Sequence, residues 1–326
     1  MLSIIIPTYN EGPWLGRTLE AVTKVLPDSP CEVIVVDDCS TDGGSFHVEH
    51  AHKKVELNHI VHTERQGTSG GRITGANAAR GDILCFLDAH VWPSAGFFDY
   101  LIDAVSENPD SIAAPGLTQF KLTEPMNPFP DPPRGTNYGG GFTIACRKCW
   151  FYMSVNKRKH QWQRRHGAYA CGMTMTRELY DDLGGWMTLP GYWSSSDVAM
   201  CMKAWLLDIP IIIETRSHHF HGVKGFGPHE TPKWHEVINR LYAARILFGE
   251  DTYNDFWLPQ LMTRFGRHWK PEWAHILDSD EVEAQHQHVR QNVVKTDAEF
   301  MERFVYPRFD KAGLPRTMPH WPGIAQ

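Results

Sequence analysis

The segment from Ile83 to His90 constrains this chain more than any other, because an apolar strand leads directly into a carboxylate and an imidazole. It reads Ile-Leu-Cys-Phe-Leu-Asp-Ala-His, and five apolar residues in a row are typical of a strand buried on both faces. The carboxyl ends of parallel strands form the crevice in which open α/β sheets bind ligands. We therefore expect Asp88 and His90 at that crevice, where a divalent cation bound to them could neutralise a diphosphate.

The first 120 residues alternate the patterns of strand and helix. Short β-branched or apolar runs indicate buried strands, and apolar residues three or four apart indicate helices. The expected strands are 3–7, 31–37 and 83–87, and the expected helices are 14–26 and 70–80. This alternation predicts an α/β fold with an open, Rossmann-like, mainly parallel sheet.

Proline and a change of periodicity divide the chain. The stretch 124–133 is dense in proline, which excludes a central strand or a helix interior and predicts a surface connection. Beyond about residue 230 apolar residues recur at helical spacing, and Thr296 with Glu299 offers a capping box to a later helix. We therefore expect one α/β domain at 1–226, with halves at 1–123 and 134–226, and a helical extension at 227–326.

Composition indicates a folded, cytoplasmic protein. Of the 326 residues 42% are hydrophobic and 12% aromatic, which suffices for one large core or two modest ones. No window approaches the roughly 18–20 consecutive apolar residues of a membrane span, and the chain opens on a strand instead of a leader. The seven cysteines are odd in number and lie mostly in apolar contexts, which favours reduced thiols. Cys146 and Cys149 offer half of a zinc site that no second pair completes.

Two further strand ends carry polar side chains. Pro7, Thr8, Tyr9 and Glu11 close the first strand, and Asp38 follows the second. Proline ends the ladder of the first strand, and a carboxylate at such an edge accepts a hydrogen bond from a base N–H. We expect these groups to hold a nucleoside. For either piece alone, an ordinary strand-to-loop turn is the alternative.

Together these segments resemble the GT-A glycosyltransferases, the nucleotide-diphospho-sugar transferases of the large inverting family 2 type. That family opens with a Pro-Thr-Tyr-Asn-Glu run, here 7–11, and continues with a Val-Asp-Asp-x-Ser-x-Asp turn, here 36–42. The resemblance covers roughly residues 2–225 and is closest to the polypeptide N-acetylgalactosaminyltransferase branch, whose metal motif is Asp-x-His. Three further segments agree with this branch: 139–142 resembles its Gly-Gly-Phe segment, 170–173 its Ala-Gly-Gly turn, and 193–205 its Trp-Gly-Gly-Glu-Asn run with a tryptophan at the same spacing. By this resemblance 1–123 is the nucleotide-binding half and 134–226 the acceptor half.

The resemblance implies roles for individual residues. The residues that would contact the nucleotide of a UDP-sugar are Pro7, Thr8, Tyr9, Glu11, Asp38, Arg72 and Asp88, and those that would line the donor and acceptor pocket are Gly172, Trp193 and Ser196. Asp88 and His90 would carry a divalent ion, manganese or alternatively magnesium, that stabilises the leaving diphosphate. The branch takes a third ligand from a histidine after an arginine. Of His218, His219 and His221, His219 is in the matching register, and a solvated histidine patch is the alternative.

Asp197 is the candidate catalytic base. Where the polypeptide branch has Glu-Asn this chain has Ser196-Asp197, and Asp197 falls at the aspartate of the Glu-Asp pair that acts as base in the inverting family. A carboxylate there could take the proton of an acceptor hydroxyl while its oxygen attacks the anomeric carbon opposite the diphosphate. The alternative is that Asp197 caps the helix expected at 198–207.

The segment from Pro132 to Arg177 contains arginine and lysine but no aspartate or glutamate, in a chain of net charge -6. Cations and an aromatic side chain alternate in its middle, as on surfaces that track phosphates and stack bases. The candidate acceptor-binding residues are Lys157, Arg158, Lys159, Trp162, Arg164 and Arg165. A polyanionic acceptor is expected, either hydroxymethylated DNA with a flipped base or a phosphate-rich or lipid-linked glycan. A solvated basic loop is the alternative.

The sequence as a whole favours a metal-dependent glycosyltransferase that acts on a nucleotide sugar and a hydroxyl. A secretory-pathway protein glycosylator is disfavoured, because neither a membrane stalk nor a lectin repeat is evident. A nucleotidyltransferase and a non-catalytic nucleic-acid-binding protein are the alternatives from other classes. The Asp197 segment opposes the first alternative, and the pair Asp88 and His90 opposes the second. The sugar and the oligomeric state are not indicated.

Overall fold

The computed structural model describes residues 1–43, 56–121, 136–145, 149–154, 160–223 and 233–306. The proline-rich stretch 124–133 and the residues Cys146, Lys157, Arg158 and Lys159 lie outside these ranges. Across the described ranges, no helix combines the length and the apolar character needed to cross a membrane.

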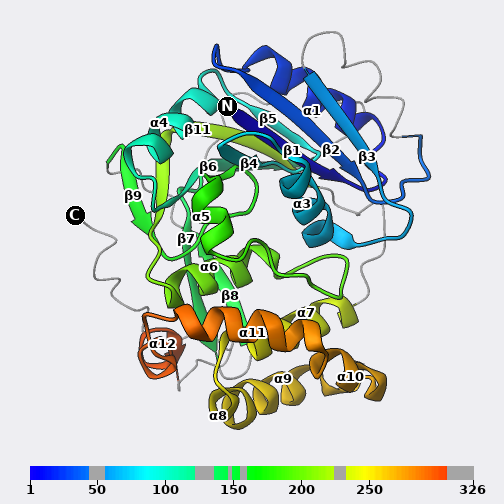
Figure 1. The fold of residues 1–326 in the computed structure, drawn as a ribbon, viewed down its shortest axis with the longest axis vertical. Coiled ribbons are helices and arrows are strands. Elements are labelled where there is room, and N and C mark those ends of the chain that lie inside the picture. The colour runs from blue at the N-terminus through cyan, green and yellow to red at the C-terminus, as the bar shows by residue number, and fades with distance from the viewer. Residues whose placement is uncertain (44–55, 122–135, 146–148, 155–159, 224–232, 307–326) are drawn as a thin grey trace.

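One nine-stranded sheet forms the centre of the molecule (Figure 1). Its order is β3-β2-β1-β4-β10-β6-β11-β5, and β9 also pairs with β11. The strands are β1 Leu2–Thr8, β2 Cys31–Asp37, β3 Glu56–Val61, β4 Ile83–Phe86, β5 Val91–Pro93, β6 Ile112–Lys121, β9 Trp162–Arg165, β10 Met173–Thr176 and β11 Ile211–Val223. The pairs among β3, β2, β1 and β4 are parallel, as is β6 with β11, whereas β10, β5 and β9 run antiparallel to their neighbours.

Alternation along β1 decides which helices cover which face. Leu2, Ile4 and Ile6 pack in one cluster with α1 and α4, whereas Ile5 packs in the other with α3, because successive side chains of a strand point to opposite faces. Helix α3 approaches β1 closely: a Cβ on Gly71 would come within 2.7 Å of the Pro7 Cβ. The helices around this sheet are α1 Pro13–Lys24, α3 Gly67–Ala78, α4 Phe97–Glu107, α5 Arg177–Asp182 and α6 Ser196–Leu206.

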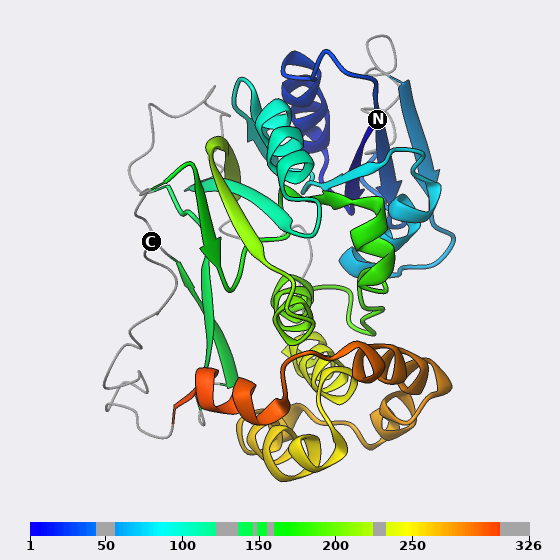
Figure 2. The ribbon, with the colours of Figure 1, turned by 60° about the vertical axis from the view of Figure 1, so that its left-hand side comes forward.

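The C-terminal helices pack as a group against α5 and α6, below the sheet in Figures 1 and 2. They are α7 Lys233–Leu247, α8 Glu250–Thr252, α9 Leu258–Phe265, α10 Ala274–Leu277, α11 Asp280–Asn292 and α12 Asp297–Phe304, with a π-helical segment at Tyr253–Trp257 and 3-10 turns at Gly266–His268 and Pro271–Trp273. Leu241 of α7 and Phe300 of α12 are fully buried in the same cluster as Met200 of α6. The helical extension thus shares a core with the preceding half.

A smaller three-stranded sheet joins this extension to the acceptor half. Its strands are β7 Gly140–Ala145, β8 Cys149–Ser154 and β12 Val305–Tyr306, in the order β12-β7-β8. Because β12 is parallel to β7, the end of the described chain is anchored beside residues 144–145.

The expected α/β sheet and helical extension are confirmed. The expected strands correspond to β1, β2 and β4, and the expected helices to α1, α3, α6 and α7. The capping box is also present, since the Glu299 N–H donates to Thr296 Oγ1 at 3.2 Å and the Thr296 N–H donates to Glu299 Oε2 at 2.7 Å.

Candidate functional site

Three strand ends converge on one crevice. Asp88 follows β4, His90 precedes β5, and His221 lies near the end of β11, where β5 pairs with it. His221 Nε2 is 3.1 Å from Asp88 Oδ2, and the His90 ring meets the His221 ring edge-on with centroids 4.7 Å apart. The structure therefore brings a carboxylate and two imidazoles together at the carboxyl end of the sheet.

These side chains fit a divalent ion. Octahedral coordination at about 2.1 Å places neighbouring ligand atoms about 3.0 Å apart, which is close to the 3.1 Å between Asp88 and His221. One carboxylate and two imidazoles are a donor set for a divalent transition-metal ion. Asp88 and His221 also form part of a cluster with Cys171, in which one ligand atom of each residue lies within 4.8 Å of the others.

Of the three candidate histidines at 218–221, the structure places His221 beside Asp88, whereas the resemblance implied His219. His221 pairs with Val91, directly after the Asp88-Ala89-His90 segment, and His219 pairs with Pro93, two residues farther on. His219 is fully buried two residues deeper on the strand, against the ring of Phe97 at 5.6 Å. Burial lowers its pKa to about 3, and its ring nitrogens have no hydrogen-bond partner among the described residues.

Glu11 contacts the metal motif, not an open nucleoside pocket. Its Oε2 lies 3.2 Å from His90 Nδ1, and its side chain is buried. A carboxylate that accepts from one ring nitrogen fixes the tautomer and leaves the other nitrogen for a metal. The structure therefore gives Glu11 a positioning role at His90, which differs from the nucleotide contact that the resemblance implies.

Arg72 joins the metal motif to helix α6. One of its terminal nitrogens is 3.2 Å from Asp88 Oδ1, the other donates to Ser196 Oγ at 2.9 Å, and its guanidinium lies 4.8 Å from the centre of the Trp186 ring. Burial alone would raise the pKa of Asp88, but the hydrogen bond with His221 and the charge of Arg72 outweigh it and hold that pKa well below its usual range. Asp88 is thus ionised and available to a cation.

Asp197 lies in the first turn of α6, next to Ser196. Burial raises the pKa of the Asp197 carboxyl, and the charge of Asp88 adds to this effect, while a hydrogen bond from the Val198 N–H at 2.8 Å and the charge of Arg72 oppose it. A raised carboxyl pKa is what a general base requires. The N-cap position is Ser195, whose side chain makes no capping hydrogen bond, so the alternative role of Asp197 at the helix start persists in its contact with the Val198 N–H.

The loop before α6 is held by two residues of α7 that the sequence analysis did not single out. The Asn239 side chain accepts from the Gly191 N–H at 2.6 Å and donates to the carbonyls of Gly191, Trp193 and Ser194 at 2.9–3.0 Å. His235 Nδ1 accepts from the Tyr192 N–H at 2.8 Å. Helix α7 therefore shapes the loop that leads to Asp197.

Backbone strain in this loop agrees with the motif alignment. Ser194 and Ser195 have φ of 83° and 72°, and these are the positions at which the resembled Trp-Gly-Gly run has glycine. Trp193 is 56% exposed and available to a ligand. Gly172 has φ of +87°, and a Cβ there would lie 2.4 Å from Pro115, so only glycine fits its turn.

At the nucleoside edge, an arginine lies between two tyrosine rings. The Arg65 guanidinium is 3.6 Å from the centre of the Tyr9 ring and 4.2 Å from that of Tyr192. Pro7 and Thr8 are buried at the end of β1 beside it. The two rings form a flat slot that could also hold a base.

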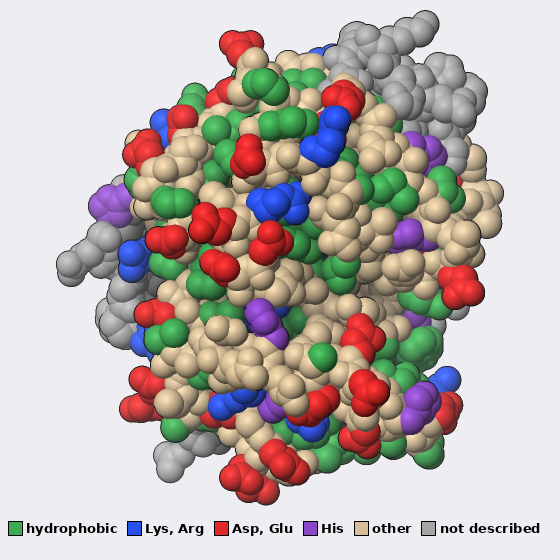
Figure 3. All heavy atoms as spheres, in the orientation of Figure 1, with side chains coloured by type: hydrophobic (Ala, Val, Ile, Leu, Met, Phe, Trp, Pro, Cys, Tyr) green, Lys and Arg blue, Asp and Glu red, His purple; other side chains and the backbone are tan. Residues whose placement is uncertain are grey.

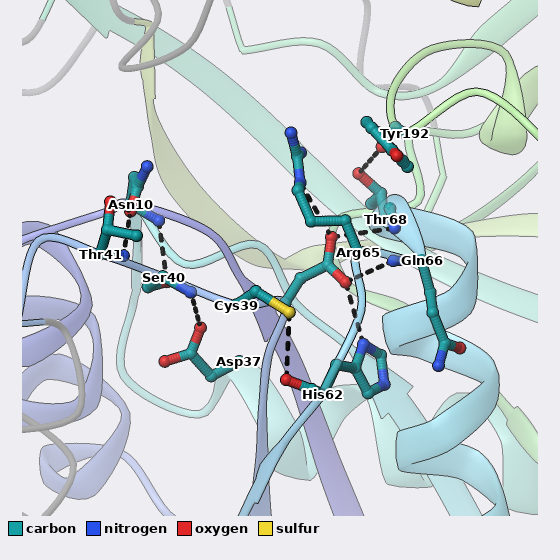
Figure 4. Close-up of polar contacts among 12 residues, drawn as sticks. Asn10, Asp37, Cys39, Ser40, Thr41, His62, Arg65, Gln66, Thr68 and Tyr192 are labelled. Carbon is teal, nitrogen blue, oxygen red and sulfur yellow. Dashed lines mark hydrogen bonds and ion pairs between the residues drawn. The ribbon is translucent and has the colours of Figure 1, made fainter.

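Asp38 anchors the start of α3, and two of its partners, His62 and Gln66, are labelled in Figure 4. Its carboxylate accepts from the backbone N–H groups of Gln66 and Gly67 at 2.7 and 2.9 Å, and it lies 2.9 Å from His62 Nδ1. Asp38 is only 3% exposed. These contacts fix the position of the Asp38 carboxylate at the start of α3.

The described part of the basic segment, which includes Trp162, Arg164 and Arg165, lies away from this crevice. Strand β9 pairs with Ile211–Glu214 at the start of β11, far along the strand from His221. The Trp162 ring N–H donates to buried Glu214, and the buried Arg165 donates to Tyr138 O and Gln163 Oε1.

Arg164 and Arg165 instead line a separate cavity of about 210 Å³ between β9 and α6, with Trp205 and Lys295. On the face seen in Figure 3, acidic and basic side chains of the described residues are interspersed. No continuous cationic track crosses the described part of that face.

Comparison with known proteins places this arrangement in a family. Residues 3–183, more than half of the chain, match Glycosyl transferase family 2. The chain therefore belongs to glycosyltransferase family 2. It is 26% identical over 270 residues to polypeptide N-acetylgalactosaminyltransferase 3 of Taeniopygia guttata, covering 78% of this chain and 42% of that protein. The human enzyme of the same name gives 26% over 267 residues, covering 76% and 41%. The chain thus spans under half the length of these curated relatives.

Solved structures agree on the fold. The structure of GalNAc-T7 with UDP, GalNAc and Mn²⁺ superposes with a TM-score of 0.70 at 18% identity, over 93% of this chain and 57% of that one. The structure of S. aureus TarS with UDP-GlcNAc gives a TM-score of 0.56 at 17% identity, over 95% and 93%. The fold is therefore that of the GT-A glycosyltransferases, as expected.

Proposed function

We propose that the chain transfers a sugar from a UDP-sugar to an acceptor hydroxyl, with a divalent ion held by Asp88, His90 and His221. The observation that carries this proposal is the 3.1 Å approach of His221 Nε2 to Asp88 Oδ2, beside His90 and at the carboxyl end of the sheet. Family membership and the fold it shares with structures that contain UDP support the donor class.

Each residue of the crevice has a separate role in the proposed reaction. When bound, the ion would neutralise the charge that develops on the leaving diphosphate. Arg72 holds the Asp88 carboxylate, and Glu11 fixes the tautomer of His90. The slot between Tyr9 and Tyr192 is placed to stack the base, provided that Arg65 moves aside.

Asp197 supplies the base in this proposal. It takes the proton of the acceptor hydroxyl as that oxygen attacks the anomeric carbon, and the bond to the diphosphate breaks on the opposite face, which inverts the anomeric configuration. The raised pKa of the carboxyl makes Asp197 a stronger base than an ordinary aspartate.

A peptide hydroxyl is the first acceptor to test, because the curated relatives are polypeptide N-acetylgalactosaminyltransferases. Hydroxymethylated DNA loses most of its support, since Trp162 and Arg165 are bonded within the protein and far from His221.

The test is release of UDP from a panel of UDP-sugars, with Mn²⁺ or with EDTA, in the presence of a Ser/Thr peptide, a glycan or hydroxymethylated DNA. The proposal expects metal-dependent release, accelerated by one acceptor that gains the mass of the sugar. It would be wrong if no donor released UDP in the presence of Mn²⁺ with any acceptor.

A further inference from the structure

The crevice contains a thiol that the proposed transfer does not use. Cys171 lies in the turn before β10, and one ligand atom each of Asp88, Cys171 and His221 lie within 4.8 Å of one another. The Cys171 side chain is 3% exposed and free of any disulfide. The resembled polypeptide branch has Ala-Gly-Gly where this chain has Ala170-Cys171-Gly172, so the sulfur is a departure from that motif.

The turn holds this sulfur in place. The Gly172 N–H donates to the Phe86 carbonyl at 2.6 Å, which ties the turn to the end of β4, two residues before Asp88. The left-handed backbone of Gly172 and its contact with Pro115 leave the turn little freedom. Cys171 therefore cannot move far from the metal-binding side chains.

The distances allow one ion to reach all of these groups. Bonds of about 2.0 Å to oxygen or nitrogen and about 2.3 Å to sulfur place tetrahedral ligand atoms roughly 3.5–4 Å apart. The observed spacing of at most 4.8 Å closes to that value with a small side-chain rotation. His90 lies outside this group of three, but its ring is edge-on to that of His221 with centroids 4.7 Å apart, so a rotation of its side chain would add a fourth donor.

We propose that Cys171 gives the crevice a second metal-binding mode. Zn²⁺, Co²⁺ or Cd²⁺ recruits the sulfur together with Asp88, His90 and His221, and the thiol proton passes to solvent as the metal–sulfur bond forms. Mn²⁺ and Mg²⁺ bind through oxygen and imidazole alone, because thiolate favours softer ions. This inference rests on the metal site of the proposed function.

The two modes have opposite consequences. A site with four protein ligands is closed, whereas a catalytic site keeps a position open for substrate. With Zn²⁺ the diphosphate would have no position on the metal, so Zn²⁺ inhibits in competition with Mn²⁺. Loss of the Cys171 sulfur removes the ligand that makes Zn²⁺ bind more tightly than Mn²⁺.

The test is titration of the metal-stripped protein with Co²⁺, Zn²⁺ and Mn²⁺. Wild type should show a thiolate-to-cobalt charge-transfer band, and both Cys171→Ser and Cys171→Ala should lose it. Zn²⁺ affinity should fall in these variants by more than the roughly 10- to 100-fold typical for loss of an outer partner, while Mn²⁺ affinity stays within about twofold. The control is Cys39→Ser, since Cys39 is a half-buried thiol that donates to the His62 carbonyl and should leave both readouts unchanged.

Cobalt bound without the band in wild type, or a band that persists in both Cys171 variants, would overturn the proposal. If neither variant folds by circular dichroism, X-ray absorption of Zn²⁺-loaded wild type decides, with a sulfur neighbour at about 2.3 Å expected and its absence contradictory. None of these measurements needs a donor or an acceptor. They therefore stand or fall separately from sugar transfer.

Discussion

Asp88 and His221 are 133 residues apart in the chain, and their Oδ2 and Nε2 atoms lie 3.1 Å apart in the fold. Asp88 follows β4, whereas His221 lies in β11. Strand β5, which begins at Val91, pairs with β11 at His221 and so brings the two residues together. In the proposed metal site this contact places the ion between Asp88 and His221. It thereby favours His221 over His218 and His219 as a ligand. Several consequences of this arrangement are open to experiment.

Substitution of His221 should affect the metal, and substitution of His219 should not. His221→Ala removes a ligand, so Mn²⁺ affinity should fall by more than the 10- to 100-fold typical for loss of an outer partner. His219→Phe keeps a ring against Phe97 in a fully buried position and should leave Mn²⁺ affinity unchanged. Calorimetric titration with Mn²⁺ compares the two. An unchanged Mn²⁺ affinity in His221→Ala together with a lower affinity in His219→Phe would show that His219 is the ligand, as the resemblance implied.

Asp197→Asn should separate binding from transfer. The amide cannot accept the acceptor proton, so kcat should fall by about 10²- to 10⁴-fold while UDP affinity stays near that of wild type. Because the pKa of Asp197 is raised, the acid limb of the wild-type pH profile should lie above the range of an ordinary aspartate, with activity lost as pH falls through it. A variant that retains full kcat would remove Asp197 from the reaction.

Asn239 should matter for the loop even though it lies in the helical extension. Asn239→Ala leaves the Gly191 N–H and three loop carbonyls without their partner, which should cost about 1–3 kcal/mol of unfolding free energy and raise the donor KM. Asn292→Ala is the matched control, since its amide is exposed and bonds only the His288 carbonyl of its own helix among the contacts described. Denaturant unfolding and donor kinetics measure both effects. Equal behaviour of the two variants would argue against the loop contact.

Stability should rise with pH because of Lys203. This buried ammonium donates to the Gly185 carbonyl at 2.7 Å, and burial lowers its pKa to about 7. Between that pH and the ordinary lysine range the unfolded chain binds more protons than the native one, so this group adds up to about 1.4 kcal/mol of stability per pH unit as pH rises.

Lys203→Met should remove this pH dependence, and Lys24→Met, at an exposed position on α1, should preserve it. Unfolding free energies measured from pH 7 to about pH 10 compare the three proteins. A slope that is the same in wild type and Lys203→Met would show that Lys203 titrates normally.

Sequence patterns predicted β1, β2 and β4 well because these strands are buried on both faces. The apolar runs of β1, β2 and β4 are each followed by polar residues. A short apolar run with polar residues at its end is a clear sequence signal for a buried strand. The same logic placed Asp88 and His90 at one edge. Alignment with a known motif further identified Ser194 and Ser195 as glycine-like positions, which their positive φ supports.

The remaining features depend on pairings that no local pattern encodes. The pairing of β11 with β5 places His221 instead of His219 beside Asp88, and the antiparallel pairing of β9 places Trp162 and Arg165 away from the crevice. The role of Asn239 arises from packing of α7 on a distant loop. For Cys171 a signal was available, because the sulfur interrupts the resembled Ala-Gly-Gly turn.

The most direct measurement is calorimetric binding of UDP to wild type and to Asp88→Asn, each with Mn²⁺ and with EDTA. Donor recognition through a metal at Asp88 predicts that wild type binds UDP tightly only with Mn²⁺, and that Asp88→Asn binds weakly under both conditions. Equal affinity of wild type with Mn²⁺ and with EDTA, or unchanged Mn²⁺-dependent binding in the variant, would contradict the assignment of this crevice.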